Sequence, residues 1–130
     1  MFDTQLTTII GVDNTLAAVF VAEVGDINRF DAPDKLAAFA GIDPSVKQSG
    51  EFNGTRCRMS KRGSPYLRRA FWLAAIAGIK SNTALRALYD KKRSQGKAHA
   101  VAVSVVMRKL CNIVYAVMKS GQPYHMDLPD

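Results

Sequence analysis

Cysteine and histidine are scarce in this chain of 130 residues, which has two of each. Cys57 and Cys111 lie far apart, and neither these cysteines nor His99 and His125 follow the C-x-x-C or His-rich spacing of a zinc site. A disulfide framework and a structural metal site are therefore not supported, and the cysteines are typical of thiols in a reducing compartment. The two histidines also leave no imidazole base near the serines in the middle of the chain.

Apolar runs long enough to cross a bilayer are also lacking. The longest, around residues 98–107, contains Ser104 and stops at Arg108 and Lys109, whereas a spanning helix needs about 20 apolar residues. The N-terminus shows no basic region followed by an apolar one, as a secretion signal would. We therefore expect a cytoplasmic protein with no membrane partner, and a chain of this length is expected to bury one core as one domain.

Acidic residues are nearly absent from residues 47–119. This segment holds sixteen Lys and Arg against Glu51 and Asp90, a net charge of +14, whereas residues 1–46 carry −5 and residues 120–130 carry −2. A field of one sign over so long a segment is typical of proteins that bind polyanions, because each neutralised phosphate releases counterions. A solvated basic face is the alternative interpretation.

Hydrophobic periodicity and capping residues predict a mainly α fold, a compact helical domain with a small β-hairpin or loop insertion. Asn53-Gly54 suits the type I′ turn of that hairpin. The expected elements are Thr4–Ile10; a helix capped by Asn14 or Thr15 and ending near Val24; a helix entered through Asp31 and Pro33 and ending at Gly41; the hairpin or loop Ser45–Met59; a helix capped by Ser64 and running to Ile79; a helix capped by Asn82 and running to Arg93; and Lys97–Lys119.

The chain divides by these elements into a helical hairpin region (1–44), a serine-bearing hairpin or loop (45–63), a helical core (64–119) and a loosely held tail (120–130). Apolar residues at spacings of three and four predict the core-facing stripes of two helices. The first stripe is Leu67, Ala70, Phe71, Ala74, Ala75 and Gly78, and the second is Ala102, Val105, Val106, Leu110, Ile113, Val114 and Val117.

The segment Val46–Phe71 gathers Lys, Arg, Ser and Gly around one carboxylate, Glu51, and predicts a phosphate-binding site. Arg68 and Arg69 fall in the first turns of a helix, where free N–H groups favour an anion, and guanidinium groups fork onto phosphate oxygens. Ordinary surface arginines at a helix start are the alternative. The candidate nucleic-acid contacts are Lys47, Arg56, Arg58, Ser60, Lys61, Arg62, Gly63, Arg68 and Arg69.

Three serines compete for a nucleophilic role in this segment. Ser49 precedes Gly50 in an expected turn, Ser60 adjoins Lys61, and Ser64 is better explained as a helix cap. A serine is a weak nucleophile unless a base or a cation activates it. The residues by themselves leave open whether any of the three attacks phosphate.

The order of several motifs resembles one known family. They are "AEVGD-INRF", "KLAAFAGIDP", "QSG", "MSKRGSPYLRRA" and "ALRALYDKKRSQGK", followed by a long apolar helix. Over residues 3–119 the chain is similar to the C-terminal domain of the bridge-RNA-guided insertion-sequence transposases, whose members add an N-terminal RuvC-like domain with a DEDD acid cluster. The positions that match are Gly25-Asp26, Phe30, Leu36, Gly41, Pro44, Ser49-Gly50, Lys61, Gly63 and Arg68-Arg69.

The resemblance implies a DNA transposase domain that acts in strand cleavage and rejoining. It implies that Ser49 is the nucleophile and forms a phosphoserine link to cleaved DNA, and that Ser60 stands where the family often has Thr, which suits phosphate contact. The expected metal, Mg, belongs to the RuvC-like domain, so no cofactor is expected in this chain. The implied partners are DNA, a guide RNA, that RuvC-like domain and further copies in an oligomer.

One departure concerns the helix-hairpin-helix unit with which this family usually opens. Its G-h-G turn is replaced here by Gly11-Val12-Asp13, and an aspartate at the second glycine repels phosphate. We expect a helix-hairpin-helix-like unit kept for packing, with nucleic-acid contacts in the basic half. A helical nucleic-acid-binding module without chemistry, in which Ser49 is a turn residue, is the main alternative, and a protein-interaction domain is a third interpretation.

Overall fold

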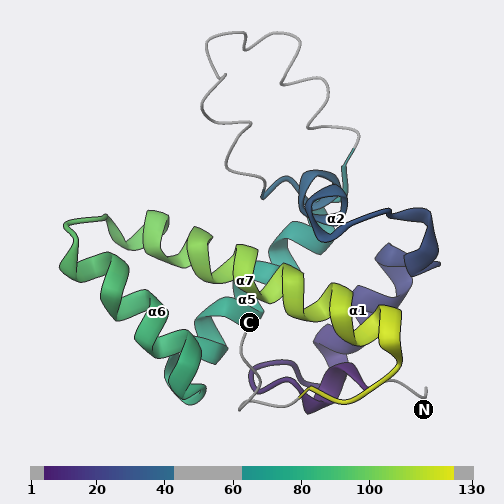
Figure 1. Ribbon diagram of the computed structural model, residues 1–130, viewed down its shortest axis with the longest axis horizontal. Coiled ribbons are helices and arrows are strands. Elements are labelled where there is room, and N and C mark those ends of the chain that lie inside the picture. The colour runs from purple at the N-terminus through teal and green to yellow at the C-terminus, as the bar shows by residue number, and fades with distance from the viewer. Residues whose placement is uncertain (1–4, 43–62, 125–130) are drawn as a thin grey trace, which may run out of the picture.

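The fold is helical throughout the part of the chain that the structure, a computed structural model, describes, namely residues 5–42 and 63–124. Within these ranges there are five α-helices, two short 3-10 helices and no strand (Figure 1). The predicted mainly α class is confirmed for them. The expected hairpin or loop at Ser45–Met59 lies outside the described residues.

The helices follow the predicted order closely. In chain order they are η1 (Leu6–Thr8), α1 (Asn14–Val24), η2 (Ile27–Arg29), α2 (Pro33–Ala40), α5 (Pro65–Ser81), α6 (Thr83–Ser94) and α7 (His99–Ser120). The first expected helix is reduced to one 3-10 turn, and η2 was not predicted.

Capping side chains fix where three of the helices begin. Ser64 and Asn82 cap α5 and α6 as predicted, but the predicted cap of α1, Asn14 or Thr15, is wrong. Asp13 caps α1 instead, since its carboxylate accepts a hydrogen bond from the Leu16 N–H at 2.9 Å. A carboxylate suits this position because it also faces the positive end of the helix dipole.

The Gly11-Val12-Asp13 turn packs against α5. Gly11 has φ +105°, and a Cβ at this position would lie 2.9 Å from the Gly78 backbone nitrogen, so only glycine fits both the conformation and the contact. Val12 is buried. Each residue of the turn therefore has a packing or capping role.

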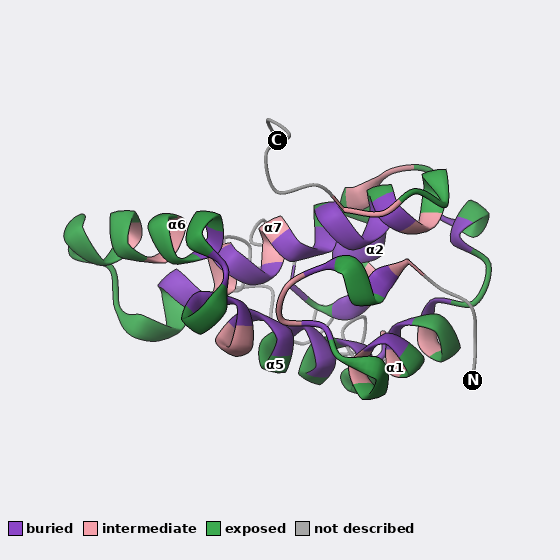
Figure 2. Ribbon diagram, turned by 90° about the horizontal axis from the view of Figure 1, so that it is seen from below, coloured by how far each residue is buried: buried purple, intermediate pink, exposed green. Residues whose placement is uncertain are grey.

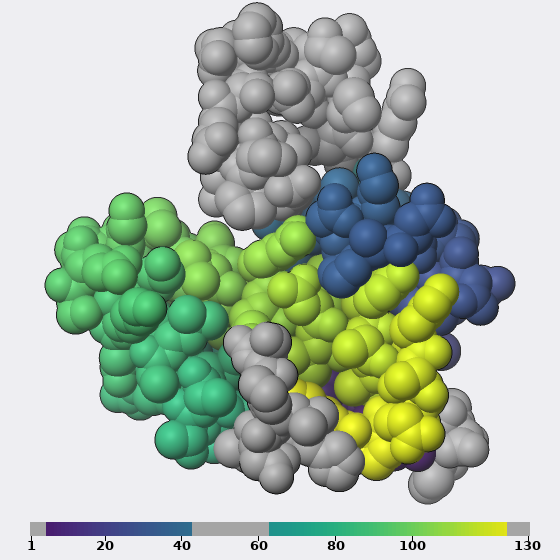
Figure 3. Space-filling view, viewed as in Figure 1, coloured from purple at the N-terminus to yellow at the C-terminus, as the bar shows by residue number. Residues whose placement is uncertain are grey.

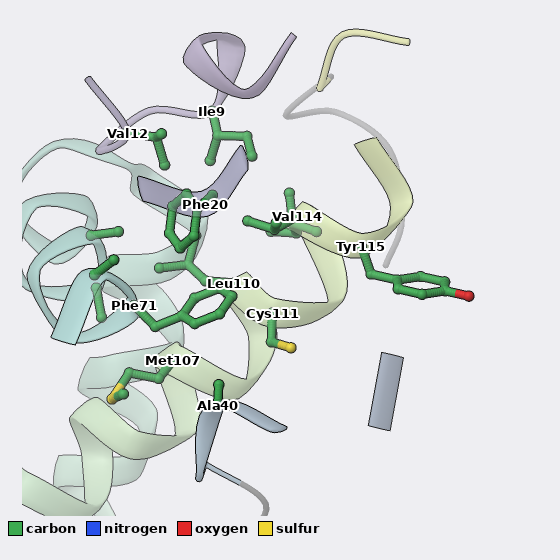
Figure 4. Packing of buried hydrophobic residues seen from close by; sticks show 14 of the residues in the cluster. Ile9, Val12, Phe20, Ala40, Phe71, Met107, Leu110, Cys111, Val114 and Tyr115 are labelled. Atoms are coloured by element: carbon green, nitrogen blue, oxygen red, sulfur yellow. The ribbon is translucent and has the colours of Figure 1, made fainter. Parts of the chain in front are cut away.

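The core surrounds α7, which crosses the domain and is buried along most of its length (Figure 2). Figure 4 shows Phe20 of α1 and Phe71 of α5 facing Leu110 and Val114 of α7, and the two phenylalanine rings lie 4.7 Å apart between centroids. The first predicted core stripe is buried completely. The second is buried except for Val105, which is half-buried, and the prediction omitted the buried residues Val103, Met107, Cys111 and Tyr115.

α7 ends close to the predicted Lys119 and extends beyond the apolar run around residues 98–107, because the helix continues through Arg108 and Lys109 to Ser120. Among the described residues it is the one helix whose length and apolar composition would allow it to cross a membrane, and half of its most apolar window is buried inside the domain. It packs against α5, α6 and α2. This burial is what a core helix of a single domain shows.

α2 packs across α7, and Figure 1 shows it almost end-on. The Tyr115 hydroxyl donates a hydrogen bond to the Phe30 carbonyl at 2.9 Å, and the Cys111 sulfur lies 3.7 Å from the Pro33 carbonyl oxygen. Further back along α7, Met107 lies near Ala40, the last residue of α2 (Figure 4).

The described start of the tail after Gly121 contacts the rest of the domain. The Tyr124 N–H donates to the Thr8 hydroxyl oxygen at 2.8 Å, and the Tyr124 side chain packs against the core. The two ends of the described chain therefore meet.

Candidate nucleic-acid interface

Three of the predicted site residues, Gly63, Arg68 and Arg69, lie in the described part of the chain. The others lie outside it; they are the predicted nucleophile Ser49 and the predicted contacts Lys47, Arg56, Arg58, Ser60, Lys61 and Arg62. Among the described residues, the candidate interface consists of the start of α5 and the surfaces around it.

Ser64 ties the start of α5 to two other elements. Its hydroxyl accepts a hydrogen bond from the Leu67 N–H at 3.0 Å, which confirms its role as the cap, and donates one to the Glu23 carboxylate at 2.6 Å. Its own N–H donates to the Phe39 carbonyl at 3.0 Å. Because Ser64 is only 7% exposed, these bonds form a buried junction between the ends of α1, α2 and α5.

Glu23 was not among the predicted site residues, although it changes the electrostatics of the α5 terminus. It places a carboxylate beside the helix end at which phosphate was expected. No local pattern predicts this contact, because Glu23 and Ser64 are 41 positions apart in the chain.

The expected free N–H groups at the start of α5 are mostly used within the chain. The N–H of Ser64 bonds to Phe39, Pro65 has none, and the N–H groups of Leu67 and Arg68 bond to Ser64. The predicted phosphate site stays a prediction, and the exposed side chains at this helix start are its main candidates among the described residues.

Exposed side chains at this end of α5 are suited to that role. Arg68 and Arg69 are both exposed, and the Arg68 side chain lies against the C-cap of α2, 3.6 Å from where a Cβ on Gly41 would stand. Tyr66 is 69% exposed beside them. An aromatic ring next to guanidinium groups allows base stacking together with phosphate contact, so Tyr66 joins the candidates.

A second basic surface lies on the arm formed by α6 and the first turn of α7, which projects on the left of Figures 1 and 3. The prediction named none of its residues as contacts. Its cations at the α6 end are Lys91, Lys92, Arg93 and Lys97. Cations in the last turn of α6 also stabilise the helix dipole, which is a structural reason for their position.

Two interactions order this arm. The Arg93 guanidinium donates to the Lys97 carbonyl at 2.9 Å, and the Tyr89 hydroxyl lies 2.8 Å from His99 Nδ1. The Arg86–Asp90 ion pair, at 3.3 Å, is exposed on both sides and contributes little to stability. Its one carboxylate leaves most of the positive charge uncompensated.

The charge asymmetry of the sequence persists in the described residues. Residues 63–119 contain eleven Lys and Arg and one acidic residue, Asp90. In the first range, Asp13 and Asp26 are used as helix caps and Glu23 binds Ser64. Three of the five acidic residues in this range thus serve local structure, whereas the basic residues of 63–119 largely face outward.

The described residues do not provide a metal site or a reactive thiol. No three His, Cys, Asp or Glu side chains lie together in this part of the chain. Burial raises the pKa of the Cys111 thiol from 9.0 to about 12, and the nearby Arg108 cation opposes this rise only in part. Cys111 is therefore a core residue held in its neutral form.

Fold and surface together define a small helical domain with one core and a strongly basic C-terminal two-thirds. Residues 3–90 match the family described as transposase IS116/IS110/IS902. The chain belongs to this transposase family, which agrees with the resemblance drawn from its motifs.

The names of similar proteins refer to insertion elements and to gene inversion. The chain is 33% identical to the insertion element IS110 43.6 kDa protein of Streptomyces coelicolor, over 95% of this chain and 30% of that protein. It is 35% identical to the IS900 42 kDa protein of Mycobacterium paratuberculosis, over 85% and 28% of the two chains. It is 28% identical to the pilin gene-inverting protein of Moraxella bovis, over 92% and 37%. The chain thus spans about a third of the length of these relatives.

Proposed function

We propose that this chain is the nucleic-acid-binding domain of a DNA transposase or invertase and that it contributes to strand cleavage and rejoining. The observation that carries the proposal is the basic surface of residues 63–119 on a chain of a transposase family. Phosphate contacts dominate the affinity of such surfaces. Names of relatives, an insertion element protein and a pilin gene-inverting protein, support DNA rearrangement as the setting.

The proposal includes DNA as the partner of Arg68, Arg69 and the α6–α7 arm. A guide RNA, the RuvC-like domain and further copies of the chain are proposed partners in the parent protein. The Gly11-Val12-Asp13 turn is proposed to be a helix-hairpin-helix-like unit retained for packing, because Gly11 lies against Gly78 and Asp13 is occupied as a cap.

In the proposed reaction Ser49 is the nucleophile. Its oxygen bonds to the phosphorus of the scissile phosphodiester, the bond from phosphorus to the leaving sugar oxygen breaks, and the serine proton ends on that oxygen. Rejoining reverses these changes with a second strand end. Since the described residues hold no cluster of metal ligands, Mg, if the reaction uses it, is assigned to the RuvC-like domain and no step here is derived through it.

Binding is tested with the isolated chain. We expect it to bind mixed-sequence duplex DNA with little sequence preference and with an affinity that falls steeply as salt rises. Changing both Arg68 and Arg69 to Ala should weaken binding without unfolding the chain, because both side chains are exposed. An affinity that stays constant between low and moderate salt would contradict the proposal.

Catalysis is tested in the parent protein with target DNA and guide RNA. Ser49→Ala should abolish the covalent DNA–protein species while DNA binding survives, and Ser60→Thr should keep much of the activity because a hydroxyl remains. If Ser60→Ala abolishes the adduct and Ser49→Ala does not, the nucleophile is Ser60. If the unaltered parent protein forms no covalent DNA adduct, the chain is a binding module without chemistry.

A further inference from the structure

The outward face of α5 exposes large apolar side chains, on the side of the helix turned away from α7 (Figure 2). Among the described residues five large hydrophobic side chains are exposed, and three of them, Tyr66, Trp72 and Leu73, belong to this helix. Single exposed apolar residues are ordinary on a protein surface, but a group of them on one helix face is typical of a binding surface.

These apolar side chains share their side of α5 with cations. Arg69 is three residues from both Tyr66 and Trp72, so it neighbours both rings on the helix surface. The spacing also separates this face from the buried stripe of the same helix. The residues that follow one another at spacings of three and four along the outward face are Tyr66, Arg69, Leu73, Ile76 and Lys80.

Every charged residue of α5 is a cation. Arg68, Arg69 and Lys80 are exposed, and the helix contains no Asp or Glu. The cations at positions 68 and 80 are separated by about 18 Å of helix rise, so positive charge borders the apolar side chains at both ends. A nucleic-acid strand complements both kinds of group, because its bases stack on aromatic rings and its phosphates bind cations.

A base-paired duplex matches this face less well than an unpaired strand does. The bases of a duplex are stacked on one another, and a protein surface meets mainly phosphates and sugars, so aromatic rings gain little. Tyr66 and Trp72 are separated by about 9 Å of helix rise, which exceeds the roughly 3.4 Å between neighbouring stacked bases of one strand. Rings at this spacing suit separate bases of an extended strand.

We propose that the outward face of α5 binds an unpaired nucleic-acid strand. Tyr66 and Trp72 stack on bases of this strand, and Arg69 and Lys80 contact its phosphates. This inference rests on the proposed function and adds to it the class of ligand, a strand whose bases are free to stack. It also gives a role to Trp72, which the charge pattern alone does not identify.

The chain contains a single tryptophan, so its fluorescence reports on this face alone. In the isolated chain, oligo-dT, which forms no duplex, should quench the emission of Trp72 to a saturating value, because a stacked base quenches indole fluorescence. Oligo-U, measured beside it, shows whether DNA or RNA provides the strand. A mixed-sequence duplex of the same length should quench much less at saturation.

Tyr66→Ala removes the most exposed ring, and the Tm should stay the same because Tyr66 is 69% exposed. We expect affinity for the quenching oligonucleotide to fall about 5- to 150-fold, the range of one base–aromatic stack, and affinity for the duplex to stay the same. The matched control is Tyr66→Phe, which keeps the ring and should bind like the original chain.

Lys80→Met tests the phosphate contact independently of the rings. It should make the slope of log affinity against log salt shallower by about 0.7, the value of one contact with a single strand. Lys35→Met, which removes an exposed charge from α2, should leave this slope unchanged. If the slope of Lys80→Met equals that of Lys35→Met, Lys80 does not contact the strand and that part of the inference is wrong.

Four further results would overturn the inference. If the oligonucleotides bind without quenching Trp72, or if Tyr66→Ala binds them as tightly as Tyr66→Phe, the strand lies elsewhere and nucleic-acid binding still stands. If the chain binds duplex DNA but neither oligonucleotide, the ligand class is wrong. If sedimentation shows a dimer that Tyr66→Ala dissociates, this face joins two copies of the chain. If the chain binds neither duplex nor oligonucleotide, the inference and the proposed function both fail.

Discussion

Replacing Gly11 with Ala tests whether the Gly11-Val12-Asp13 turn serves to pack against α5. At φ +105° an L-residue is strained by about 1–2 kcal/mol. The new Cβ would also stand 2.9 Å from the Gly78 nitrogen and 3.0 Å from the Ala74 carbonyl oxygen, both backbone atoms that cannot move aside alone. Overpacking of this kind costs about 1–3 kcal/mol, so the free energy of unfolding should fall by about 2–5 kcal/mol.

Urea denaturation of the isolated chain measures this loss, and Gly96→Ala is the matched control. Gly96 has φ +87° but nothing within 4 Å of its would-be Cβ, so its substitution should show the conformational cost alone. The difference between the two variants isolates the contact with α5. A Gly11→Ala chain as stable as Gly96→Ala would refute the packing argument. Where the Gly11→Ala chain is folded, its DNA affinity should equal that of the original chain, because the turn is not assigned a phosphate.

Three further predictions concern the core and the junction at α5. Leu110→Ala should lower the free energy of unfolding by about 2–5 kcal/mol in urea titrations, because Leu110 is fully buried; a near-neutral value would contradict its core position. Ser64→Ala should lower it by about 1–3 kcal/mol through loss of the cap and of the bond to Glu23, and Ser64→Thr, which keeps the hydroxyl, should lose less. Because burial raises the pKa of the Cys111 thiol from 9.0 to about 12, the stability it contributes is complete below pH 9 and is lost as pH rises toward about 12. Cys111→Ala should therefore lose less stability than the original chain over that range, and parallel pH curves would count against this reasoning.

Local signals predicted most of the helical framework. Ser64-Pro65 and Asn82 marked the starts of α5 and α6, and the glycines that end α1 and α2 were placed correctly. These features depend on a few neighbouring residues, so one sequence contains them. Asp13 was missed as a cap because it was interpreted only as the last residue of a turn. In the structure it both ends the turn and caps α1.

Contacts between distant segments could not be predicted in this way. Arg29 shows the limit: its guanidinium stacks on Phe30 and Phe39 and donates to the Val24 carbonyl, so a residue counted as basic charge serves to join α1 to α2. Arg108 Nη1 is buried without a hydrogen-bond partner, and this too depends on contacts with other parts of the chain. Periodicity assigns a residue to a helix face, but it does not say which partner occupies that face.

The junction at Ser64 connects the fold to the proposed chemistry. Phe39 near the end of α2 and Ser64 at the start of α5 are hydrogen-bonded, and Glu23 fixes the same serine from α1. Residues 42 and 63, which flank the segment containing Ser49, are therefore held at one place on a buried core. The Arg68 side chain approaches that place from α5, where it lies against Gly41. A phosphate bound there would be positioned by groups whose geometry the core determines, which is the arrangement that cleavage of a selected bond requires.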